Sequence, residues 1–513
     1  MTARAPDQTR HRALGLLAAA AALVLAGCAA GPDYTRPTVP TGRAFSEAAP
    51  ADAAPVHDLP RDWWTLFRHP ALDALMAEAF KNSPTLAAAR HAVRAAEEAR
   101  LAQQAALWPQ VQATESPTRT KIAGNLGGNS PGVQGDGSVI STVSNPPRSA
   151  GGTAPFNQPV IYNFHTAQVS ISYAPDVFGS LGRQVESSAA LAQAQTYEWQ
   201  AARVTLAANL ASAAILDAQL RQQIRSAQAA AQAAQDALRL AERLRQGGYL
   251  AGSDEAAQRL ALLSLQQAVP PLQQHLEQNR NWMRALIGAP QDRPLPAFEL
   301  SDFHWPQALP SSLPSQLLEQ RPDVRAAEAQ LHAAVAQIGV ARAARLPQFA
   351  ITADAGGAAS RLSQAFLASG RFFDLTATLT APLFDAGAAR HRELGAAATA
   401  AQAEAQYRAT VLGALQNVAD VLQAMSADDA AWTLAQRGTD TTAQALALAQ
   451  RRVDAGYQDR SALLAAETAH HQAEQQAAAA QAARLTHLVA LYQALGGGWW
   501  HDDDPPRAAA SQP

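Results

Sequence analysis

The fold of this chain is decided by residues 183–246, which read RQVESSAALAQAQTYEWQAARVTLAANLASAAILDAQLRQQIRSAQAAAQAAQDALRLAERLRQ. The stretch contains neither proline nor glycine, so at about 1.5 Å per residue it can form one helix roughly 96 Å long. Small and apolar residues recur along it in alternating steps of four and three, which is the spacing of a coiled coil. Only Asp217 interrupts this seam, which consists of Leu206, Leu210, Ala213, Asp217, Leu220, Ile224, Ala227, Ala231, Ala234, Leu238 and Ala241. The stretch therefore predicts a very long helix that packs closely against neighbouring helices.

The composition of the whole chain favours such narrow helical seams over one wide core. Of its 513 residues, 48% are hydrophobic but only 6% are aromatic, and 16% are charged, against about 25% charged in an average globular protein. The formal net charge of −3 excludes a basic nucleic-acid-binding protein. A single cysteine excludes an internal disulfide framework and a multi-cysteine zinc site.

Motifs of the first half recur in the second half in the same order. Pro84 and Pro109 bracket an alanine-rich segment, and Pro322 and Pro347 bracket another one of the same length. Further matching pairs are Tyr173-Ala174-Pro175 with Thr380-Ala381-Pro382, Gly247-Gly248-Tyr249 with Ala455-Gly456-Tyr457, and Leu286-Ile287-Gly288 with Ala494-Leu495-Gly496. Such offsets indicate two tandem structural repeats. The first repeat also carries a loop at about 117–158 that is rich in Gly, Ser, Asn and Pro, which predicts a long surface loop.

Each repeat is expected to contain two strands and one long helix. Apolar and polar residues alternate at about 108–116 and 164–175, and again at about 348–355 and 372–381, which is the period of a strand. The long helices are expected at about 183–246 and 390–455, and Gly247-Gly248 and Gly456 supply the positive-φ positions that end them. A half-buried strand of a soluble sheet shows the same alternation, whereas about ten such residues also suit a tilted outer-membrane strand.

Four membrane strands per chain predict an assembly of several chains. Alone, they would leave two unpaired edges facing lipid, where each unsatisfied backbone group costs several kcal/mol. Two chains would supply eight strands, whose interior is filled by side chains, whereas three chains would supply twelve and enclose a pore. We therefore predict a homotrimer. Phe178 and Phe384 are expected where strands meet helices. They are either aromatic residues at the membrane–water interface or ordinary packing residues.

The N-terminus has the features of a lipoprotein signal. Three arginines precede an apolar run from Ala13 to Ala26, which is too short for a membrane span. Leu25-Ala26-Gly27-Cys28 resembles the bacterial lipobox, in which the cysteine becomes the acylated first residue, and Ala29 favours delivery to the outer membrane. The alternative is an ordinary secretory signal with an incidental cysteine. We expect Cys28 to carry the lipid that anchors the chain to the outer membrane.

Several segments together resemble one known family. They are DYTRP at 33–37, DWWTLFRHPAL at 62–72, NSPTL at 82–86, WP at 108–109, DVFG at 176–179, PLFDAG at 382–387 and ALGGGW at 494–499. These segments are distributed in order along nearly the whole mature chain. They resemble the outer-membrane factor (TolC-like) family of tripartite efflux pumps, and specifically its lipoprotein branch, the NodT-type efflux proteins. One departure is Tyr173-Ala174-Pro175, where the family more often has a Trp-Glu-Leu-like triplet; it affects a strand-to-helix junction and not the fold.

The resemblance implies a mostly α protein with a membrane β-barrel. It implies a trimeric twelve-stranded barrel in the outer membrane, continuous with a twelve-helix periplasmic tunnel and a mixed equatorial belt. We divide the chain into a signal peptide, a lipidated extension, the first repeat, an inter-repeat equatorial segment, the second repeat and a tail, at 1–27, 28–60, 61–289, 290–322, 323–498 and 499–513.

The implied function is that of a passive duct for small molecules or drugs. Its implied partners are two further copies of the chain, outer-membrane lipid, a periplasmic adaptor and an inner-membrane transporter of the RND type, with no nucleic acid. A conduit for type I protein secretion is the alternative, although the lipid anchor and the ALGGGW ending resemble the efflux branch more closely. The sequence does not name the exported compound.

Two sets of residues are the candidate sites. The turns after the long helices are expected to dock the adaptor, through Gly248, Tyr249, Ser253, Gly456, Tyr457, Arg460 and Ser461. The second set is a gate at the periplasmic end. Family members close it with an aspartate and an arginine at positions that here are Ala465 and Thr468. The repeat offset instead pairs Arg259 with Glu467 between neighbouring coils, with Asp254, Glu255, Asp459 and Arg460 just outside; ordinary solvated surface charges are the alternative.

No arrangement of residues predicts an enzyme, a metal site or a cofactor. Gly128-Asn129-Ser130-Pro131-Gly132 matches the nucleophile motif of serine hydrolases, but Pro131 lacks the N–H that the oxyanion hole needs. His470 and His471 lie near Glu467 and Glu474, yet adjacent histidines point about 100° apart on a helix, so a solvated or interhelical face is favoured over a metal site.

Overall fold

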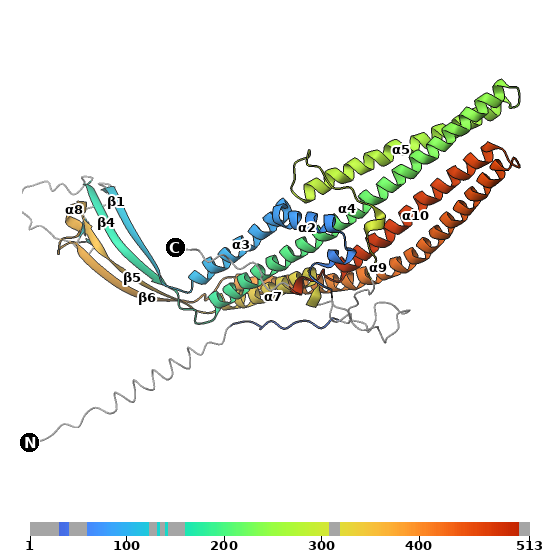
Figure 1. The fold of residues 1–513 in the computed structure, drawn as a ribbon. Coiled ribbons are helices and arrows are strands. Elements are labelled where there is room, and N and C mark those ends of the chain that lie inside the picture. Colours follow the sequence, from blue (N-terminus) through green and yellow to red (C-terminus); the bar gives the residue numbers. More distant parts are fainter. Residues whose placement is uncertain are drawn as a thin grey trace, which may run out of the picture. The chain divides into compact units, whose positions relative to one another are not determined.

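The computed structural model describes residues 30–39, 59–122, 131–133, 139–141, 160–306 and 319–501. The expected signal peptide, Cys28, most of the expected loop at 117–158 and the end of the tail lie outside the described residues. The chain divides into two compact units (Figure 1). The strand unit comprises 1–35, 97–191 and 331–402, and the hairpin unit comprises 36–96, 192–330 and 403–513.

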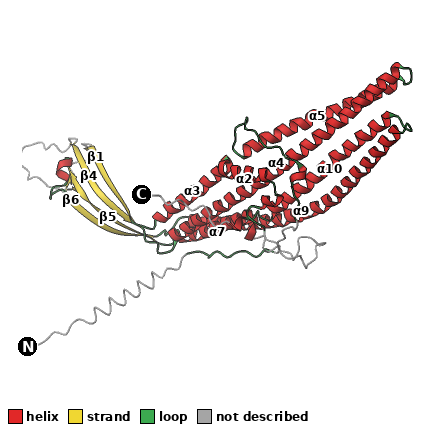
Figure 2. Ribbon diagram, in the orientation of Figure 1, coloured by secondary structure: helices red, strands yellow, loops and turns green. Residues whose placement is uncertain are grey.

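The strand unit is built on one antiparallel sheet (Figure 2). Its order is β1-β4-β5-β6, with β1 at Gln110–Ile122, β4 at Val160–Tyr173, β5 at Gln348–Ala359 and β6 at Arg371–Thr380. The one-turn helix α8 (Leu362–Ala365) separates β5 from β6, and the short strands β2 (Pro131–Val133) and β3 (Val139–Ser141) form a separate pair. The outermost strands of the sheet are therefore β1 and β6, one from each half of the chain.

Strand β1 continues beyond its expected end. The sequence predicts that it stops at about 116, where the expected surface loop rich in Gly, Ser, Asn and Pro begins. In the structure Pro117 pairs with His165, and the ladder continues to Ile122 opposite Val160. Within one chain β1 is an edge strand of the sheet, and edge strands are where sheets accept proline. Strand β5 also runs on, to Ala359 rather than to about 355.

The helices of the two halves match in length. Helices α3 (Pro84–Ala105) and α7 (Pro322–Ala343) have 22 residues each, α4 (Ser180–Gln246) and α9 (Ala388–Asp454) have 67 each, and α5 (Gly252–Leu286) and α10 (Arg460–Ala494) have 35 each. Helix α4 begins slightly before its expected start because the Asp176 carboxylate accepts hydrogen bonds from Leu181 N and Gly182 N, at 3.0 and 2.6 Å. Asp385 does the same for Ala389 N at 2.7 Å, and such caps supply partners to unpaired N–H groups of a helix start. No helix among the described residues has both the length and the apolar character to cross a membrane.

In the hairpin unit, α4 pairs with α5 and α9 pairs with α10 (Figure 1). Asp217, which interrupts the apolar seam of α4, is only 1% exposed. It binds Arg221 at 2.6 Å and Arg280 of α5 at 3.4 Å, and it accepts a hydrogen bond from Phe298 N at 3.3 Å. This aspartate therefore joins α4, α5 and the segment that follows α5.

An aromatic core joins distant parts of the hairpin unit. Trp63 of the 3₁₀ helix η1 (Trp63–Phe67) lies 5.1 Å from Tyr492 of α10 between ring centroids, and Phe67 lies 6.1 Å from Phe303. Trp63, Phe67 and Tyr492 are fully buried. Residues that precede α2 (Pro70–Asn82) thus pack between the end of α10 and the segment after α5.

Candidate functional sites: the two-faced sheet and the hairpin turns

The four-stranded sheet has one apolar and exposed face. The register pairs odd-numbered residues with odd-numbered residues throughout, so they share one face. Among the sheet residues whose burial is described, every exposed large hydrophobic residue lies on it: Val111, Val169, Ile171, Phe349, Ile351, Phe373, Leu375 and Leu379. Phe373 is 87% exposed and Leu375 is 74% exposed. The odd-numbered face of the sheet is therefore apolar and exposed in the single chain.

The even-numbered face of the same sheet is polar. Ser170 Oγ donates to the carboxylate of Asp354, and Gln168 Nε2 donates to the same carboxylate at 3.3 Å. Thr376 Oγ1 donates to the carboxylate of Asp374 at 3.0 Å, and Asp374 lies opposite Asp354 in the ladder. Polar side chains across three strands therefore line this face.

The two hairpin turns have the same backbone geometry. Gly248 has φ +79° and Gly456 has φ +73°, which confirms the prediction that glycine ends each long helix. Tyr249 N donates to Leu244 O, and Tyr457 N donates to Arg452 O, each at 2.8 Å. This is the Schellman arrangement, which turns the chain and leaves the next side chain outside.

The side chains expected to dock a partner lie on these turns. Tyr249 is 83% exposed and Tyr457 is 86% exposed. Ser253, Arg460 and Ser461 are exposed in the first turns of α5 and α10. The structure therefore brings one exposed tyrosine and neighbouring polar residues to the end of each hairpin.

Asp459 has a role that sequence reasoning missed. Its carboxylate accepts hydrogen bonds from Ser461 Oγ and from Ala462 N at 3.1 Å, and together they hold the pKa of Asp459 below its usual range. It is the N-cap of α10. The signal was present in the sequence, because aspartate before a helical segment is a frequent cap.

Glu255 does not lie at the exposed mouth where it was expected. It is only 6% exposed, because it forms ion pairs with Arg245 of α4 and with Arg259 of α5, the latter at 2.8 Å. Arg259 also lies 3.5 Å from Glu242, so it has partners within its own hairpin. Within the described part of one chain, no ion pair joins Arg259 to Glu467. Glu467 is half-buried on α10, and Asp254 is exposed.

The paired histidines of α10 belong to an interhelical contact. His471 Nδ1 lies 2.9 Å from Glu474 Oε2, and Ser226 Oγ of α4 donates to the same oxygen at 3.1 Å. His470 Nδ1 lies 3.2 Å from Thr442 Oγ1 of α9. Across the described ranges, no group of three or more His, Cys, Asp and Glu residues is arranged to hold a metal ion.

Residues 30–36, just after Cys28, are packed against the folded chain. Ala30 N donates to Phe178 O at 3.0 Å, and Asp33 pairs with Arg183 of α4 at 2.6 Å. The ring of Tyr34 stacks on His332 of α7 at 4.4 Å. The chain therefore contacts the folded strand unit from Ala30 onward, which is only two residues after the expected lipid site.

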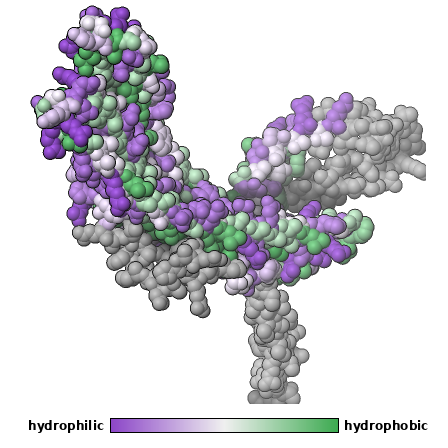
Figure 3. All heavy atoms as spheres, turned by 90° about the vertical axis from the view of Figure 1, so that its right-hand side faces the viewer, coloured by the Kyte–Doolittle hydropathy of each residue, from purple (hydrophilic) through white to green (hydrophobic). Residues whose placement is uncertain are grey.

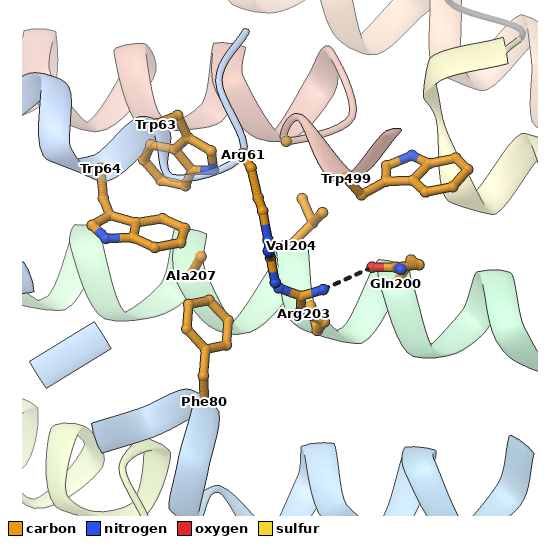
Figure 4. A pocket seen from close by; sticks show the side chains of 10 residues that line it. Arg61, Trp63, Trp64, Phe80, Gln200, Arg203, Val204, Ala207 and Trp499 are labelled. Carbon is orange, nitrogen blue, oxygen red and sulfur yellow. Dashed lines mark hydrogen bonds between the residues drawn. The ribbon is translucent and has the colours of Figure 1, made fainter. Parts of the chain in front are cut away.

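The hairpin unit has a surface of mixed character and one small cleft beside α4. On the face shown in Figure 3, hydrophobic residues are scattered among hydrophilic ones. Figure 4 shows a cleft in which Arg203 lies 5.5 Å from the ring centroid of Phe80 and donates to Gln200 Oε1 at 3.3 Å. Its free volume of about 20 Å³ holds little more than one water, so it is no site for a drug-sized ligand.

Comparison with known proteins places this arrangement in context. Residues 75–289 and 313–497 match the family of outer membrane efflux proteins. The pyoverdine export outer membrane protein OpmQ of Pseudomonas putida is 31% identical over 89% of this chain and 91% of its own length. The toluene efflux pump outer membrane protein TtgF of Pseudomonas putida is 27% identical over 93% of this chain and 96% of its own length. The solved structure of the outer-membrane channel OprN is 28% identical, with a TM-score of 0.77 over 92% of this chain and all of that one.

Proposed function

Because this chain belongs to the family of outer membrane efflux proteins, we propose that three copies of it close into one channel that exports small molecules. It is the outer-membrane component of an efflux system, and the family is one of ducts rather than of enzymes. The observation that carries the trimer proposal is the four-stranded sheet, which has an exposed apolar face and two open edges.

Closure of the sheet gives the edge strands hydrogen-bond partners and places each face of the sheet in an environment that suits its side chains. In lipid, the free N–H and C=O groups of β1 and β6 need partners, and β6 of one copy can pair with β1 of the next. Three copies give a twelve-stranded barrel with the odd-numbered face toward lipid and the polar face toward a pore. Helix α9 supports the same assembly, because it leaves a series of leucines exposed in the single chain: Leu394, Leu412, Leu422, Leu434 and Leu448.

The remaining features extend this proposal to a lipid-anchored tripartite pump. The matching helix lengths of the two halves support two tandem repeats, which in a trimer supply a twelve-helix tunnel with the equatorial belt around it. Cys28 carries the anchor, and two residues that follow it in the chain, Ala30 and Asp33, contact Phe178 and the start of α4. The partners are a periplasmic adaptor, which docks at Tyr249 and Tyr457, and an inner-membrane transporter of the RND type.

The cargo is set elsewhere in such a pump. Relatives of similar identity carry names that refer to pyoverdine export and to toluene efflux, which are chemically unrelated compounds. A duct of one architecture therefore accepts different cargo, and we assign selectivity to the inner-membrane transporter.

The proposal is tested by labelling the turns. Tyr249→Cys and Tyr457→Cys, each coupled to a bulky maleimide, should abolish efflux of a fluorescent substrate, because the adduct covers the exposed end of a hairpin. Light scattering of the extracted protein should still give a trimer. Arg90→Cys, on the exposed surface of α3, is the matched control and should leave efflux unchanged. A monomer would contradict the closed sheet, and full labelling with unchanged efflux would contradict docking at the turns.

A further inference from the structure

Helix α8 lies against the apolar face of the sheet. Gly357 is an odd-numbered residue of β5, and a Cβ atom built on it would lie 1.9 Å from the carbonyl oxygen of Ala365. A Cβ atom on Gly370 would lie 2.6 Å from the same oxygen, and Ala365 itself is fully buried. Glycine at both positions therefore lets the backbone of α8 approach this face. Since the odd-numbered face is the one that meets lipid, α8 lies outside the barrel wall and not in the pore.

This one-turn helix exposes apolar side chains between two arginines. Leu362, Phe366 and Leu367 are 43%, 57% and 56% exposed. Arg361 precedes the helix, and Arg371 begins β6 and donates from Nε to Phe366 O at 2.9 Å. Apolar side chains flanked by basic ones are typical of elements that lie at the boundary between acyl chains and lipid headgroups.

Two more basic residues lie on the same face beyond its apolar band. Arg119 and Lys121 are exposed, odd-numbered residues of β1, and they lie opposite Asn163 and Ile161, near the end of β1 that is remote in sequence from α3. Among the described residues, no ion pair includes Arg119 or Lys121. Glu115, the acidic residue of β1 on this face, lies 3.0 Å from His165 Nδ1.

We propose that α8, Arg371, Arg119 and Lys121 form a binding surface for the phosphate groups of outer-leaflet lipid. This inference rests on the proposed function, because closure of the barrel brings the β6 edge of one copy beside the β1 edge of the next. Each seam then carries Arg371 on one side and Arg119 and Lys121 on the other. Like charges at a seam repel, and an anionic phosphate that lies among them removes the repulsion. Leu362, Phe366 and Leu367 insert beside the acyl chains of the same lipid.

The experiment measures lipid binding to the purified full-length trimer by native mass spectrometry. The probes are lipid A with both phosphates, the same lipid A with both phosphates removed, and inorganic phosphate. Each basic residue near a surface contributes about fivefold to the binding of anionic lipid, so R119Q/K121Q/R371Q should lose affinity for phosphorylated lipid A by about tenfold or more. Wild-type trimer should bind the dephosphorylated lipid and inorganic phosphate far more weakly.

K81Q/R90Q/R437Q is the matched control, with one lysine and two arginines that are exposed on helices, and it should bind lipid A like the wild type. The inference is overturned when wild-type trimer binds lipid A with and without its phosphates equally well. It is also overturned when the control loses as much affinity for lipid A as R119Q/K121Q/R371Q does. Tighter binding of free phosphate than of lipid A would overturn the lipid assignment. The proposed function is tested separately, because trimer formation and efflux of R119Q/K121Q/R371Q are measured in parallel. Both should be preserved in this variant.

A nitroxide at Phe366→Cys tests the placement of α8 without removing any charge. In reconstituted trimer its relaxation should respond more to oxygen, which partitions into lipid, than to a water-soluble nickel chelate. The opposite order would put α8 in water and overturn the lipid contact.

Discussion

At the scale of single residues, a half-buried acidic side chain joins the two hairpins. Burial by itself raises the pKa of Glu474, but its hydrogen bonds with His471 and Ser226 hold that pKa below the usual range. Ser226 belongs to α4 and is 3% exposed, so this carboxylate connects α10 with the first hairpin. A group whose pKa is lowered by folding stabilises the protein above its unfolded pKa, and that stability is lost as the pH falls through the folded value.

Glu474→Gln should therefore change how the protein responds to acid. The unfolded pKa of glutamate is about 4.3, so wild-type protein should lose apparent melting temperature between about pH 5 and pH 3 more steeply than the variant. Circular dichroism of the extracted trimer at a series of pH values measures this slope. Glu277→Gln, an exposed position of α5, is the control and should follow the wild type. Equal slopes for all three proteins would remove Glu474 as the source.

At the scale of elements, the two return helices differ although they have the same length. Pro270 and Pro271 lie inside α5, and neither can donate a helical hydrogen bond to the carbonyl one turn earlier. A hollow of about 330 Å³ opens there between α4 and α5, lined by Gln228, Ala231, Gln232, Gln235, Gln266, Val269 and Pro270. The same place in α10 is held by Ala478, which is 4% exposed. The first hairpin is therefore the looser of the two at this level.

Pro270→Ala combined with Pro271→Ala should stiffen α5. Proline is about 3 kcal/mol less favourable than alanine inside a helix, so amide exchange over residues 262–279 should slow by about tenfold or more. Hydrogen exchange with mass spectrometry measures it, and the reciprocal change Ala478→Pro should speed exchange in α10. Unchanged exchange in α5 would mean that packing against α4 alone sets its stability.

At the scale of the whole molecule, we predict that contacts between neighbouring hairpins of the trimer hold the proposed pore closed. We predict that Arg259 and Glu467 pair across neighbouring coils in the assembled trimer. In the single chain Arg259 instead contacts Glu255 and Glu242. Arg259 can therefore form its ion pair either with a neighbouring hairpin or within its own hairpin. A conductance measurement distinguishes these two roles.

Arg259→Ala and Glu467→Ala should each raise the resting single-channel conductance in planar bilayers, because each removes one partner of the pair. The double variant should conduct no more than either single one, as expected for residues that act together. Glu255→Gln, which disturbs only the first hairpin, is the control and should stay closed. Should Glu255→Gln open the channel while Glu467→Ala does not, the arginine acts within its own hairpin.

Features that depend on residues close together in the chain were predictable from the sequence. The long helices, the alternating strands and the turns at Gly248 and Gly456 follow from spacing, from local propensity and from the freedom of glycine at positive φ. The family and its efflux function were also predictable, because segments that resemble this family occur along nearly the whole chain. These features need no knowledge of which distant segments meet.

Contacts between residues far apart in the chain, in contrast, depend on how folding brings those residues together. Strand β1 extends past Pro117 because β4 offers it a partner, and Asp217 is tolerated in an apolar seam because Arg280 and Phe298 N approach it. Glu255 is buried for the same kind of reason, since arginines of two helices converge on it. The energy of a buried charge or an edge proline depends on partners far away in the chain, and no local pattern contains that information.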